Sequence, residues 1–207
     1  KHFSAGADLG WMRSMADMDH AENVADAQQL AALMEAVDHC PAPVIARVQG
    51  AAFGGALGLI CAADIAVAAD DARFCLSEVR LGILPAVIAP YVVRALGPRQ
   101  ARRYFMTAEV IPADKAEQLS LIHTRVPRDE LDDAVEEQIE LLRQGAPGAQ
   151  QHARELVSRV AFEPIHADMR DYTAHLIADL RAGTEGREGL SAFLEKRSPT
   201  WQQGSNQ

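Results

Sequence analysis

Apolar and polar positions follow two rhythms along this chain, and the rhythm changes between its two halves. Short apolar runs from Val44 to Val48, from Ile65 to Ala69 and from Arg73 to Leu76 are typical of short strands. Between the first two runs, an apolar segment from Ala56 to Ala63 follows a pair of glycines and predicts a helix. The first half thus alternates strand, helix and strand, which favours an α/β fold with crossover connections and a partly parallel sheet.

Helical spacing dominates the rest of the chain. From Ala21 to Val37 apolar side chains recur every three or four residues, and the prolines at 41 and 43 end this helix. One more strand is expected from Ile122 to Val126. Further helices are expected at residues 99–107, 113–119, 129–144, 150–160, 165–181 and 187–196. Because the composition changes near Arg128, we predict two parts, an α/β core at residues 1–127 and a helical region at residues 128–207.

Composition and charge exclude some classes of function. The 207 residues are 48% apolar and 24% charged, which is ordinary for a globular protein. The net charge of -9 argues against nucleic-acid binding, which needs a basic face, but it allows a small anionic ligand. The three cysteines stand alone among apolar neighbours, so we expect reduced core residues, with neither a disulfide framework nor a zinc site.

The reduced cysteines also bear on the location of the protein, and from them we expect a cytoplasmic protein. No signal peptide is seen, and the uncharged stretch from Ala51 to Ala63 is too short to cross a bilayer, so we expect no membrane contact. The chain begins at Lys1 without a methionine or a leading structural element. We therefore expect an N-terminal segment to be missing from this sequence.

Two loops of small residues are the first candidates for chemistry. Gly6 and Ala7 lie in one, and Gly54 and Gly55 lie in another at residues 51–55. Without bulky side chains, a ligand can approach the backbone N–H groups closely, and two such donors would form an oxyanion hole. The dipole of the helix after Gly55 would strengthen it. Glycine pairs more often simply make turns, so the loops alone leave both interpretations open.

Glu78 is the second candidate. It follows the apolar run that ends at Leu76, where a carboxylate would be partly removed from water. Loss of solvent raises the pKa of a carboxyl group and suits it to proton transfer near neutral pH. The alternative is a surface glutamate paired with Arg80, and the residues themselves favour neither.

Taken together, these segments resemble the enoyl-CoA hydratase/isomerase (crotonase) superfamily. The resemblance covers essentially the whole chain, in the order and spacing of four segments. They are His2-Phe3-Ser4-Ala5-Gly6-Ala7-Asp8-Leu9, Val48-Gln49-Gly50-Ala51-Ala52-Phe53-Gly54-Gly55, the strand leading to Glu78, and Glu188-Gly189-Leu190-Ser191-Ala192-Phe193-Leu194-Glu195-Lys196-Arg197. The resemblance implies a crotonase-like spiral of ββα units, a helical C-terminal trimerisation region, and assembly as a homo-trimer or hexamer.

The resemblance also implies roles for individual residues. The backbone N–H groups of Ala7 and Gly55 would hold the thioester oxygen, with Gly54 and Gly58 beside them. Glu78 would exchange a proton with a substrate carbon. The CoA channel would be lined by Ala7, Asp8, Leu9 and Gly10, with Phe193 and Lys196 near the CoA adenine and phosphate. Lys196 could equally be a solvated helix charge. The substrate is an acyl-CoA, and no cofactor or metal is implied, since CoA is part of the substrate.

One departure from the family pattern is Gly58. Hydratases of this family typically hold water between two glutamates, and the first is expected three residues after Gly55. Three interpretations remain. Glu78 could both activate water and return the proton, with another polar group positioning the water. The protein could be a delta-isomerase, which needs only one carboxylate. It could also bind CoA thioesters without turnover.

A finer resemblance favours the hydratase. The segments at 50–60, 74–80 and 84–90 are similar to bacterial methylglutaconyl-CoA hydratases of leucine and isoprenoid degradation, which share the glycine at the position of Gly58. Their substrate carries a distal carboxylate, for which Arg80 is the candidate cationic partner; Arg80 could instead form a structural ion pair. A mammalian-type relative adds an RNA-binding module as an alternative, which the negative charge disfavours.

Other chemistries find no support in the sequence. The seven histidines lack metal-ligand spacing, and there is neither a Gly-x-Ser-x-Gly elbow nor a Gly-x-Gly-x-x-Gly motif for a dinucleotide. We therefore predict an enoyl-CoA hydratase-type lyase.

Overall fold

The computed structural model describes residues 1–15 and 17–203, which form two compact units. The first holds Lys1–Cys40 and Val44–Glu136, and the second holds Pro41–Pro43 and the chain from Glu137 onward. The division falls inside a helix, between Glu136 and Glu137, nine residues later than the sequence prediction near Arg128. The reason is Leu131, which is fully buried against Val67 and Ala69 and so holds the start of that helix on the first unit.

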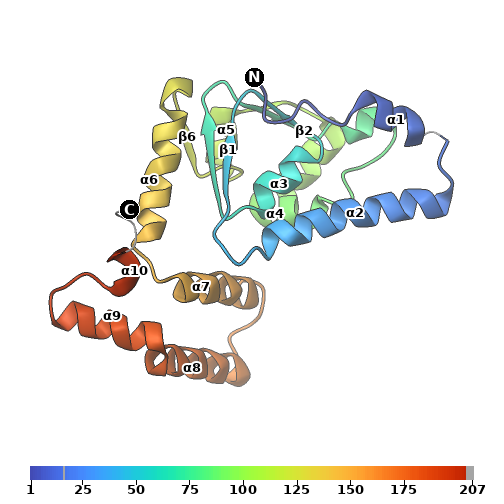
Figure 1. The fold of residues 1–207 in the computed structure, drawn as a ribbon. Coiled ribbons are helices and arrows are strands. Elements are labelled where there is room, and N and C mark those ends of the chain that lie inside the picture. The colour runs from blue at the N-terminus through green and yellow to red at the C-terminus, as the bar shows by residue number, and fades with distance from the viewer. Residues whose placement is uncertain (16, 204–207) are drawn as a thin grey trace. The chain divides into compact units, whose positions relative to one another are not determined.

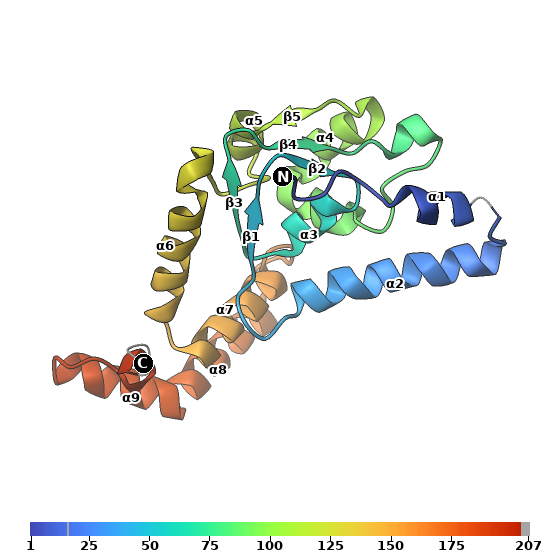
Figure 2. The ribbon, with the colours of Figure 1, turned by 45° about the horizontal axis from the view of Figure 1, so that its top comes forward.

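Two three-stranded sheets form the frame of the first unit (Figures 1 and 2). In one sheet, β3 (Ile65–Ala69) pairs in parallel with both β1 (Ile45–Val48) and β6 (Thr124–Val126). In the other, β4 (Arg73–Cys75) pairs in parallel with β2 (Ala51–Phe53) and antiparallel with β5 (Ile111–Pro112). Parallel pairing of strands adjacent in one sheet requires crossover connections, as the alternating pattern predicts.

The remaining elements of the first unit are helical. They are α1 (Leu9–Met15), α2 (His20–Asp38), α3 (Ala56–Ala62), the 3-10 helix η1 (Glu78–Leu81), α4 (Ala89–Thr107), α5 (Ala113–Gln118), the 3-10 helix η2 (Arg128–Glu130) and the start of α6 (Leu131–Arg143). A capping box of Asp19 and Glu22 starts α2, which packs against α3, and α3 in turn packs against α4. Figure 1 shows α2 extending past α3 to a far end that lies near α1.

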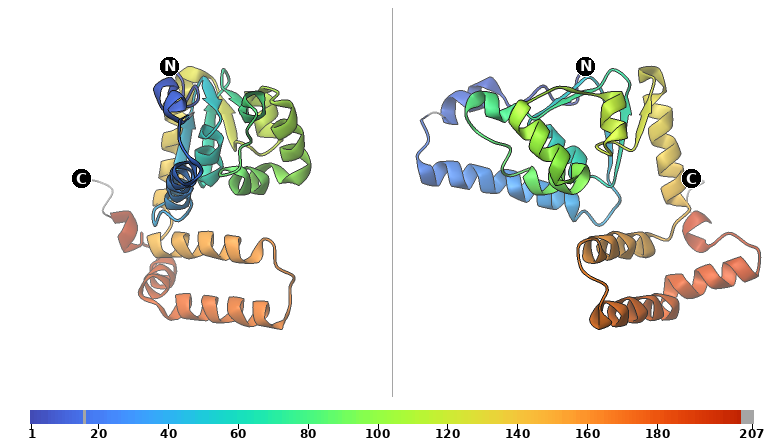
Figure 3. Two further views of the ribbon diagram at one scale, coloured as in Figure 1. Left: turned by 90° about the vertical axis from the view of Figure 1, so that its right-hand side faces the viewer. Right: turned by 180° about the vertical axis from the view of Figure 1, so that it is seen from behind.

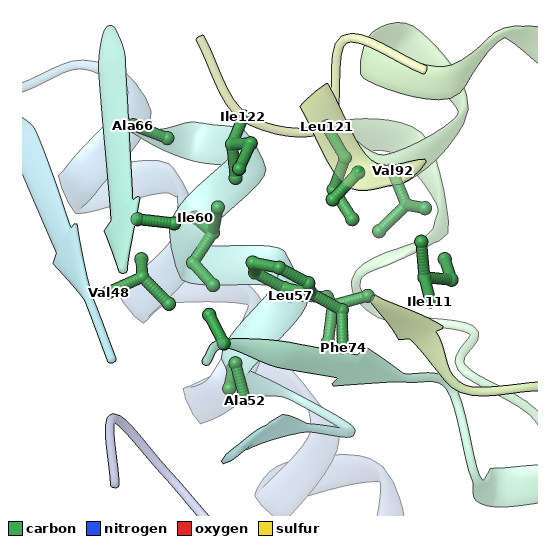
Figure 4. Packing of buried hydrophobic residues seen from close by; sticks show 14 of the residues in the cluster. Val48, Ala52, Leu57, Ile60, Ala66, Phe74, Val92, Ile111, Leu121 and Ile122 are labelled. Carbon is green, nitrogen blue, oxygen red and sulfur yellow. The ribbon is translucent and has the colours of Figure 1, made fainter. Parts of the chain in front are cut away.

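The core of the first unit is built around α3. Figure 4 shows Leu57 and Ile60 of α3 together with Val48 and Ala66 of one sheet and Phe74 of the other. All five side chains are almost completely buried. Removal of this apolar surface from water is the main stabilising contribution, and it fixes α3 relative to the strands on which the site depends.

The second unit contains only helices in the described part of the chain. They are the end of α6, then α7 (Pro147–Val160), α8 (Ala167–Ala182), α9 (Thr184–Leu194) and α10 (Thr200–Gln203), and Figure 3 shows their succession. Glu185 of α9 accepts hydrogen bonds from the backbone N–H groups of Gly148 and Ala149, at 3.0 Å each, and so caps α7. Helices α8 and α9 pack against each other.

Most predicted elements agree with the structure to within a few residues, but the sequence did not predict the short elements α1, β5, η2 and α10. Three further segments differ from the prediction. Residues 51–53, expected in a loop, form β2. Helix α4 begins at Ala89, ten residues before the expected start, because two helices join at a non-helical Gly97. Glu78 opens η1 instead of following a strand directly. No helix in the described part of the chain has the length and apolarity that a membrane crossing requires.

Candidate active site

Two neighbouring chain segments carry the predicted oxyanion-hole donors. Ser4 and Ala52 form a parallel bridge, with Ser4 N donating to the Ala51 carbonyl at 3.0 Å and Phe53 N donating to the Ser4 carbonyl at 3.0 Å. Ala7 lies three residues after Ser4 on one segment, and Gly55 lies three residues after Ala52 on the other. Because the segments run side by side in the same direction, the two predicted donors lie at the same edge of the sheet.

A glycine with positive φ precedes each donor. Gly6 has φ 115° and Gly54 has φ 60°, a backbone region that L side chains rarely adopt. Each turn exposes the N–H of the next residue. Among the described residues, neither the Ala7 nor the Gly55 N–H donates a hydrogen bond within the protein. Both groups are therefore available to a ligand oxygen, as an oxyanion hole requires.

The carboxyl group of Glu78 lies beside this pair of turns. A Cβ built on Gly54 would be 3.4 Å from Glu78 Oε1, which is van der Waals contact. Gly54 itself is held by β4, since its N–H donates to the Cys75 carbonyl at 2.9 Å. The structure thus brings Glu78 and the Gly54–Gly55 turn together, although they are more than twenty residues apart in sequence.

The environment of Glu78 suits proton transfer. Its Oε2 atom is buried and has no hydrogen-bond partner within the described part of the chain. Burial raises the pKa of this carboxyl group above its ordinary value, and a hydrogen bond from its own backbone N–H partly offsets the rise. The alternative of a surface ion pair with Arg80 is not what the structure shows, because no salt bridge joins the two residues where the chain is described.

Gly58 stands in the first turn of α3, and its surroundings leave no room for a side chain. A Cβ there would lie 2.4 Å from Ile88 Cγ2 and 2.8 Å from Met34 Sδ. Contacts under 3 Å require a neighbour to move, and Ile88 and Met34 are both buried. The position at which the family typically has its first glutamate is therefore filled by core packing. Sequence reasoning found the glycine but not these two neighbours, which come from distant segments.

The predicted CoA-channel residues lie at the start of α1. Asp8 Oδ1 accepts a hydrogen bond from the Trp11 N–H at 2.9 Å, so its side chain caps this helix. Ala7 and Gly10 are exposed, and the side chain of Leu9 lies outside the described part of the structure. Phe193 and Lys196 belong to the second unit, and Phe193 is 81% exposed.

Arg80 makes a contact that the sequence did not predict. Its Nη2 donates to the backbone carbonyl of Ala108 at 2.7 Å. The same carbonyl accepts a weaker hydrogen bond from Cys75 Sγ at 3.3 Å. No group of three or more His, Cys, Asp or Glu side chains among the described residues is arranged to hold a metal ion.

Comparison with known proteins agrees with this geometry. The family model for enoyl-CoA hydratase/isomerase matches residues 1–205. The chain belongs to the enoyl-CoA hydratase/isomerase family. A crystal structure of an enoyl-CoA hydratase from Shewanella pealeana is 52% identical, with a TM-score of 0.94 over 97% of this chain and 75% of that chain.

Two curated relatives are also similar. A crotonyl-CoA hydratase from Syntrophomonas wolfei is 35% identical over 95% of this chain and 75% of its own length. A 2,3-dehydroadipyl-CoA hydratase from Escherichia coli is 34% identical over 96% of this chain and 76% of its own length. The predicted crotonase-type α/β fold and the predicted class, a hydro-lyase of the enoyl-CoA hydratase type, are both confirmed.

Proposed function

We propose that this protein adds water to the double bond of an α,β-unsaturated acyl-CoA with Glu78 as its acid–base group. The observation that carries the proposal is the pairing of two unused backbone N–H groups with a buried carboxylate oxygen that has no protein partner in the described residues. Together they provide the two things that hydration of a thioester needs, namely stabilisation of negative charge on oxygen and transfer of a proton.

The first step places charge on the thioester oxygen. When water attacks the β-carbon, the double bond shifts and the carbonyl oxygen becomes an enolate oxyanion. The N–H groups of Ala7 and Gly55 would donate to this oxygen, and their fixed turns need no rearrangement as the charge develops. Each donor of this kind contributes about 100- to 1000-fold to the rate in other enzymes.

The second requirement is a balanced proton transfer. In the proposed mechanism, the Glu78 carboxylate takes a proton from the attacking water as the new C–O bond forms. It then delivers that proton to the α-carbon, which converts the enolate to the 3-hydroxyacyl thioester and restores the carboxylate. One carboxylate therefore suffices for the proton balance, and the crowding around Gly58 is consistent with the lack of a second carboxylate at that position.

For the acyl group, we propose a 3-methylglutaconyl-CoA-type substrate. The proposal is supported by the likeness of the segments around Gly58, Glu78 and Pro85 to bacterial methylglutaconyl-CoA hydratases. The acyl groups named for the curated relatives, crotonyl and 2,3-dehydroadipyl, differ from each other and from this one. The family accordingly supports an enoyl-CoA substrate more strongly than any particular acyl group.

A second candidate is a delta-isomerase, and the packing at Gly58 is the observation that favours it. A single carboxylate can remove a proton from one carbon of a 3-enoyl-CoA and deliver it to another. An isomerase needs no bound water, so the glycine at the position of the first glutamate would not impair it. The oxyanion hole would serve both reactions equally.

A substrate panel distinguishes these proposals. The purified protein is incubated with 3-methylglutaconyl-CoA, crotonyl-CoA and a 3-enoyl-CoA, and the products are separated by liquid chromatography with mass detection. We expect the first substrate to give a product heavier by one water, and the second to give a smaller amount of hydrated product. A shifted 3-enoyl double bond with no hydration of any substrate would replace the hydratase by the isomerase.

The role of Glu78 is tested by the Glu78→Gln variant. Loss of a general acid–base group typically costs about 100- to 10,000-fold, so we expect kcat to fall in that range while CoA-thioester binding, measured by calorimetry, stays near the wild-type value. Glu130→Gln is the matched control, because it changes an exposed glutamate of another 3-10 helix. An unchanged kcat in Glu78→Gln would remove this residue from the mechanism.

A further inference from the structure

Glu78 sits on an element with little intrinsic rigidity. Helix η1 is a single 3-10 turn of four residues, a geometry that is poorly hydrogen-bonded and used only in short pieces. Ser77 at its N-terminus provides no side-chain cap. The turn is closed by backbone bonds from Arg80 N to the Ser77 carbonyl at 3.0 Å, from Gly82 N to the Val79 carbonyl at 3.2 Å and from Ile83 N to the Glu78 carbonyl at 3.3 Å. These bonds are all local, so they close the turn but do not fix the Glu78 carboxyl group relative to the rest of the site.

Arg80 supplies that contact. Its hydrogen bond to the Ala108 carbonyl is the only side-chain hydrogen bond that joins η1 to another element in the described part of the chain. A guanidinium donating to a carbonyl forms a charge-assisted bond, which is stronger than a neutral one. The bond reaches 28 residues along the chain, from the turn that carries Glu78 to the end of α4.

The acceptor is itself held firmly. Ala108 is completely buried and has φ 50°, a left-handed conformation that directs the chain from α4 toward β5. Its N–H donates to the Tyr104 carbonyl, and β5 pairs with β4 through Ile111 and Phe74. A buried carbonyl must be hydrogen-bonded, and here Cys75 and Arg80 share it.

Glu78 lies in the chain between two residues whose side chains both donate a hydrogen bond to the carbonyl oxygen of Ala108. Cys75 lies three residues before Glu78 and Arg80 two residues after it, and both donate to the Ala108 oxygen. We propose that Arg80 is a positioning residue, whose hydrogen bond to the Ala108 carbonyl fixes η1 and so holds the Glu78 carboxyl group beside the Gly54–Gly55 turn. This inference rests on the proposed role of Glu78, and it differs from the predicted role of Arg80 as partner of a substrate carboxylate.

The effect on the rate follows from geometry. A displacement of about 1 Å at a reacting group costs as much as 100-fold in rate, while the CoA portion would still bind through residues outside η1. Arg80→Met keeps much of the aliphatic stem and removes the donors. We expect it to lower kcat by about 10- to 100-fold with KM changed less than about threefold, for a neutral and for a carboxylated acyl-CoA alike.

The experiment compares kcat and KM of wild type, Arg80→Met, Arg80→Lys and Arg103→Met with crotonyl-CoA and 3-methylglutaconyl-CoA. Lysine has a donor that can reach a single carbonyl, so Arg80→Lys should recover a large part of the lost kcat. Arg103→Met is the matched control, because Arg103 lies on α4 before Ala108 and pairs with Glu109 instead of η1. We expect it to retain wild-type kcat.

Three other results would contradict either the positioning role of Arg80 or the proposed function. A loss confined to 3-methylglutaconyl-CoA and expressed in KM would overturn the proposal in favour of a substrate-carboxylate contact. A lower unfolding temperature in Arg80→Met with unchanged kcat would show a merely structural bond and would also overturn it. Wild type that hydrates neither substrate would instead refute the proposed function, which separates the two failures.

Discussion

At Glu78, the requirements of catalysis and of stability oppose each other. Burial raises the pKa of its carboxyl in the folded protein above the ordinary value of 4.5, so the folded state holds the proton more tightly than the unfolded state does. The protonated carboxyl stabilises the fold at low pH, and this contribution is lost as the pH rises through the folded-state pKa. At neutral pH the ionised Glu78 carboxyl therefore lowers the free energy of unfolding.

We therefore predict that Glu78→Gln raises the free energy of unfolding near pH 7, because it replaces a half-buried charge by a neutral group of the same shape. The gain should shrink as the pH is lowered from 7 and the wild-type carboxyl takes up its proton, because the folded-state pKa is raised. Urea unfolding followed by circular dichroism at a series of decreasing pH values measures this gain. Glu130→Gln serves as control and should stay within about 0.5 kcal/mol of wild type. A less stable Glu78→Gln at pH 7 would contradict the assignment.

At Gly58, packing decides whether a substitution by alanine stabilises or destabilises the protein. Glycine to alanine within a helix ordinarily stabilises by up to about 1 kcal/mol. Here the new Cβ would meet Ile88 Cγ2 at 2.4 Å, so we expect Gly58→Ala to destabilise by about 1–3 kcal/mol in urea unfolding. For the same reason, Gly58→Glu should not increase the hydration rate.

The control for Gly58 is a double-mutant cycle with Ile88→Ala. Removing the Ile88 side chain creates space, so the two substitutions should be less damaging together than their separate effects predict. Strict additivity would show that Ile88 does not fill the position. A Gly58→Glu variant with a faster hydration rate than wild type would show that the second carboxylate can be accommodated after all.

The residues of the site differ in how far the sequence could predict them. Small residues in two loops and a carboxylate after an apolar run make Ala7, Gly55 and Glu78 candidates, but their roles are predicted only through the resemblance of the whole pattern to the crotonase superfamily. The contacts of Gly58 with Ile88 and Met34 could not be predicted, because they join segments whose proximity is set only by folding. The bond from Arg80 to Ala108 was hidden for the same reason.

Among the elements, α4 contains a joint that offers a separate test. Gly97 has φ 72° and ψ 158°, a conformation essentially restricted to glycine, and Pro98 starts the following helical turns. A Cβ at Gly97 would have nothing within 4 Å, so steric contact is not a concern. Any cost of a side chain there comes from the backbone.

We predict that Gly97→Ala destabilises the protein by about 1–3 kcal/mol, the usual cost of a strained backbone conformation. Differential scanning calorimetry should show a lower unfolding temperature, while kcat below that temperature stays at the wild-type value. Arg99→Ala, an exposed substitution two residues later, is the control and should have little effect. A Gly97→Ala protein as stable as wild type would mean that the two helices can join differently.

The strands and α4 show which elements the sequence can predict and which it cannot. The run at Ile65–Ala69 is predicted correctly because a buried parallel strand is a continuous apolar stretch. Strand β1 is predicted from its β-branched residues, although the exposed Arg47 interrupts its apolar pattern. The sequence predicts a loop in place of β2, because this strand has only three residues and is flanked by glycines at both ends. The first half of α4 was overlooked because Pro90 and Gly97 interrupt the helical signal, although proline is accommodated in the first turn of a helix.

At the scale of the molecule, the surface of the second unit has an apolar stripe on α9. Leu190, Phe193 and Leu194 are 55%, 81% and 78% exposed, and their spacing of three and four residues places them on one face of the helix. Large apolar side chains grouped in this way mark interaction surfaces. Sequence reasoning predicted the helix from its periodicity, but the periodicity does not show whether a stripe faces the chain's own core or another subunit.

We predict that the stripe contributes to a homo-trimer, or to a hexamer built from two of them. Light scattering coupled to gel filtration should then give at least three times the 22.4 kDa of one chain. Leu194→Asp should reduce this mass, because a buried carboxylate without a partner is costly at an interface. Thr184→Asp, exposed on the same helix but outside the stripe, should leave it unchanged. A wild-type mass of one chain would refute the assembly, and an intact trimer in Leu194→Asp would place the interface elsewhere.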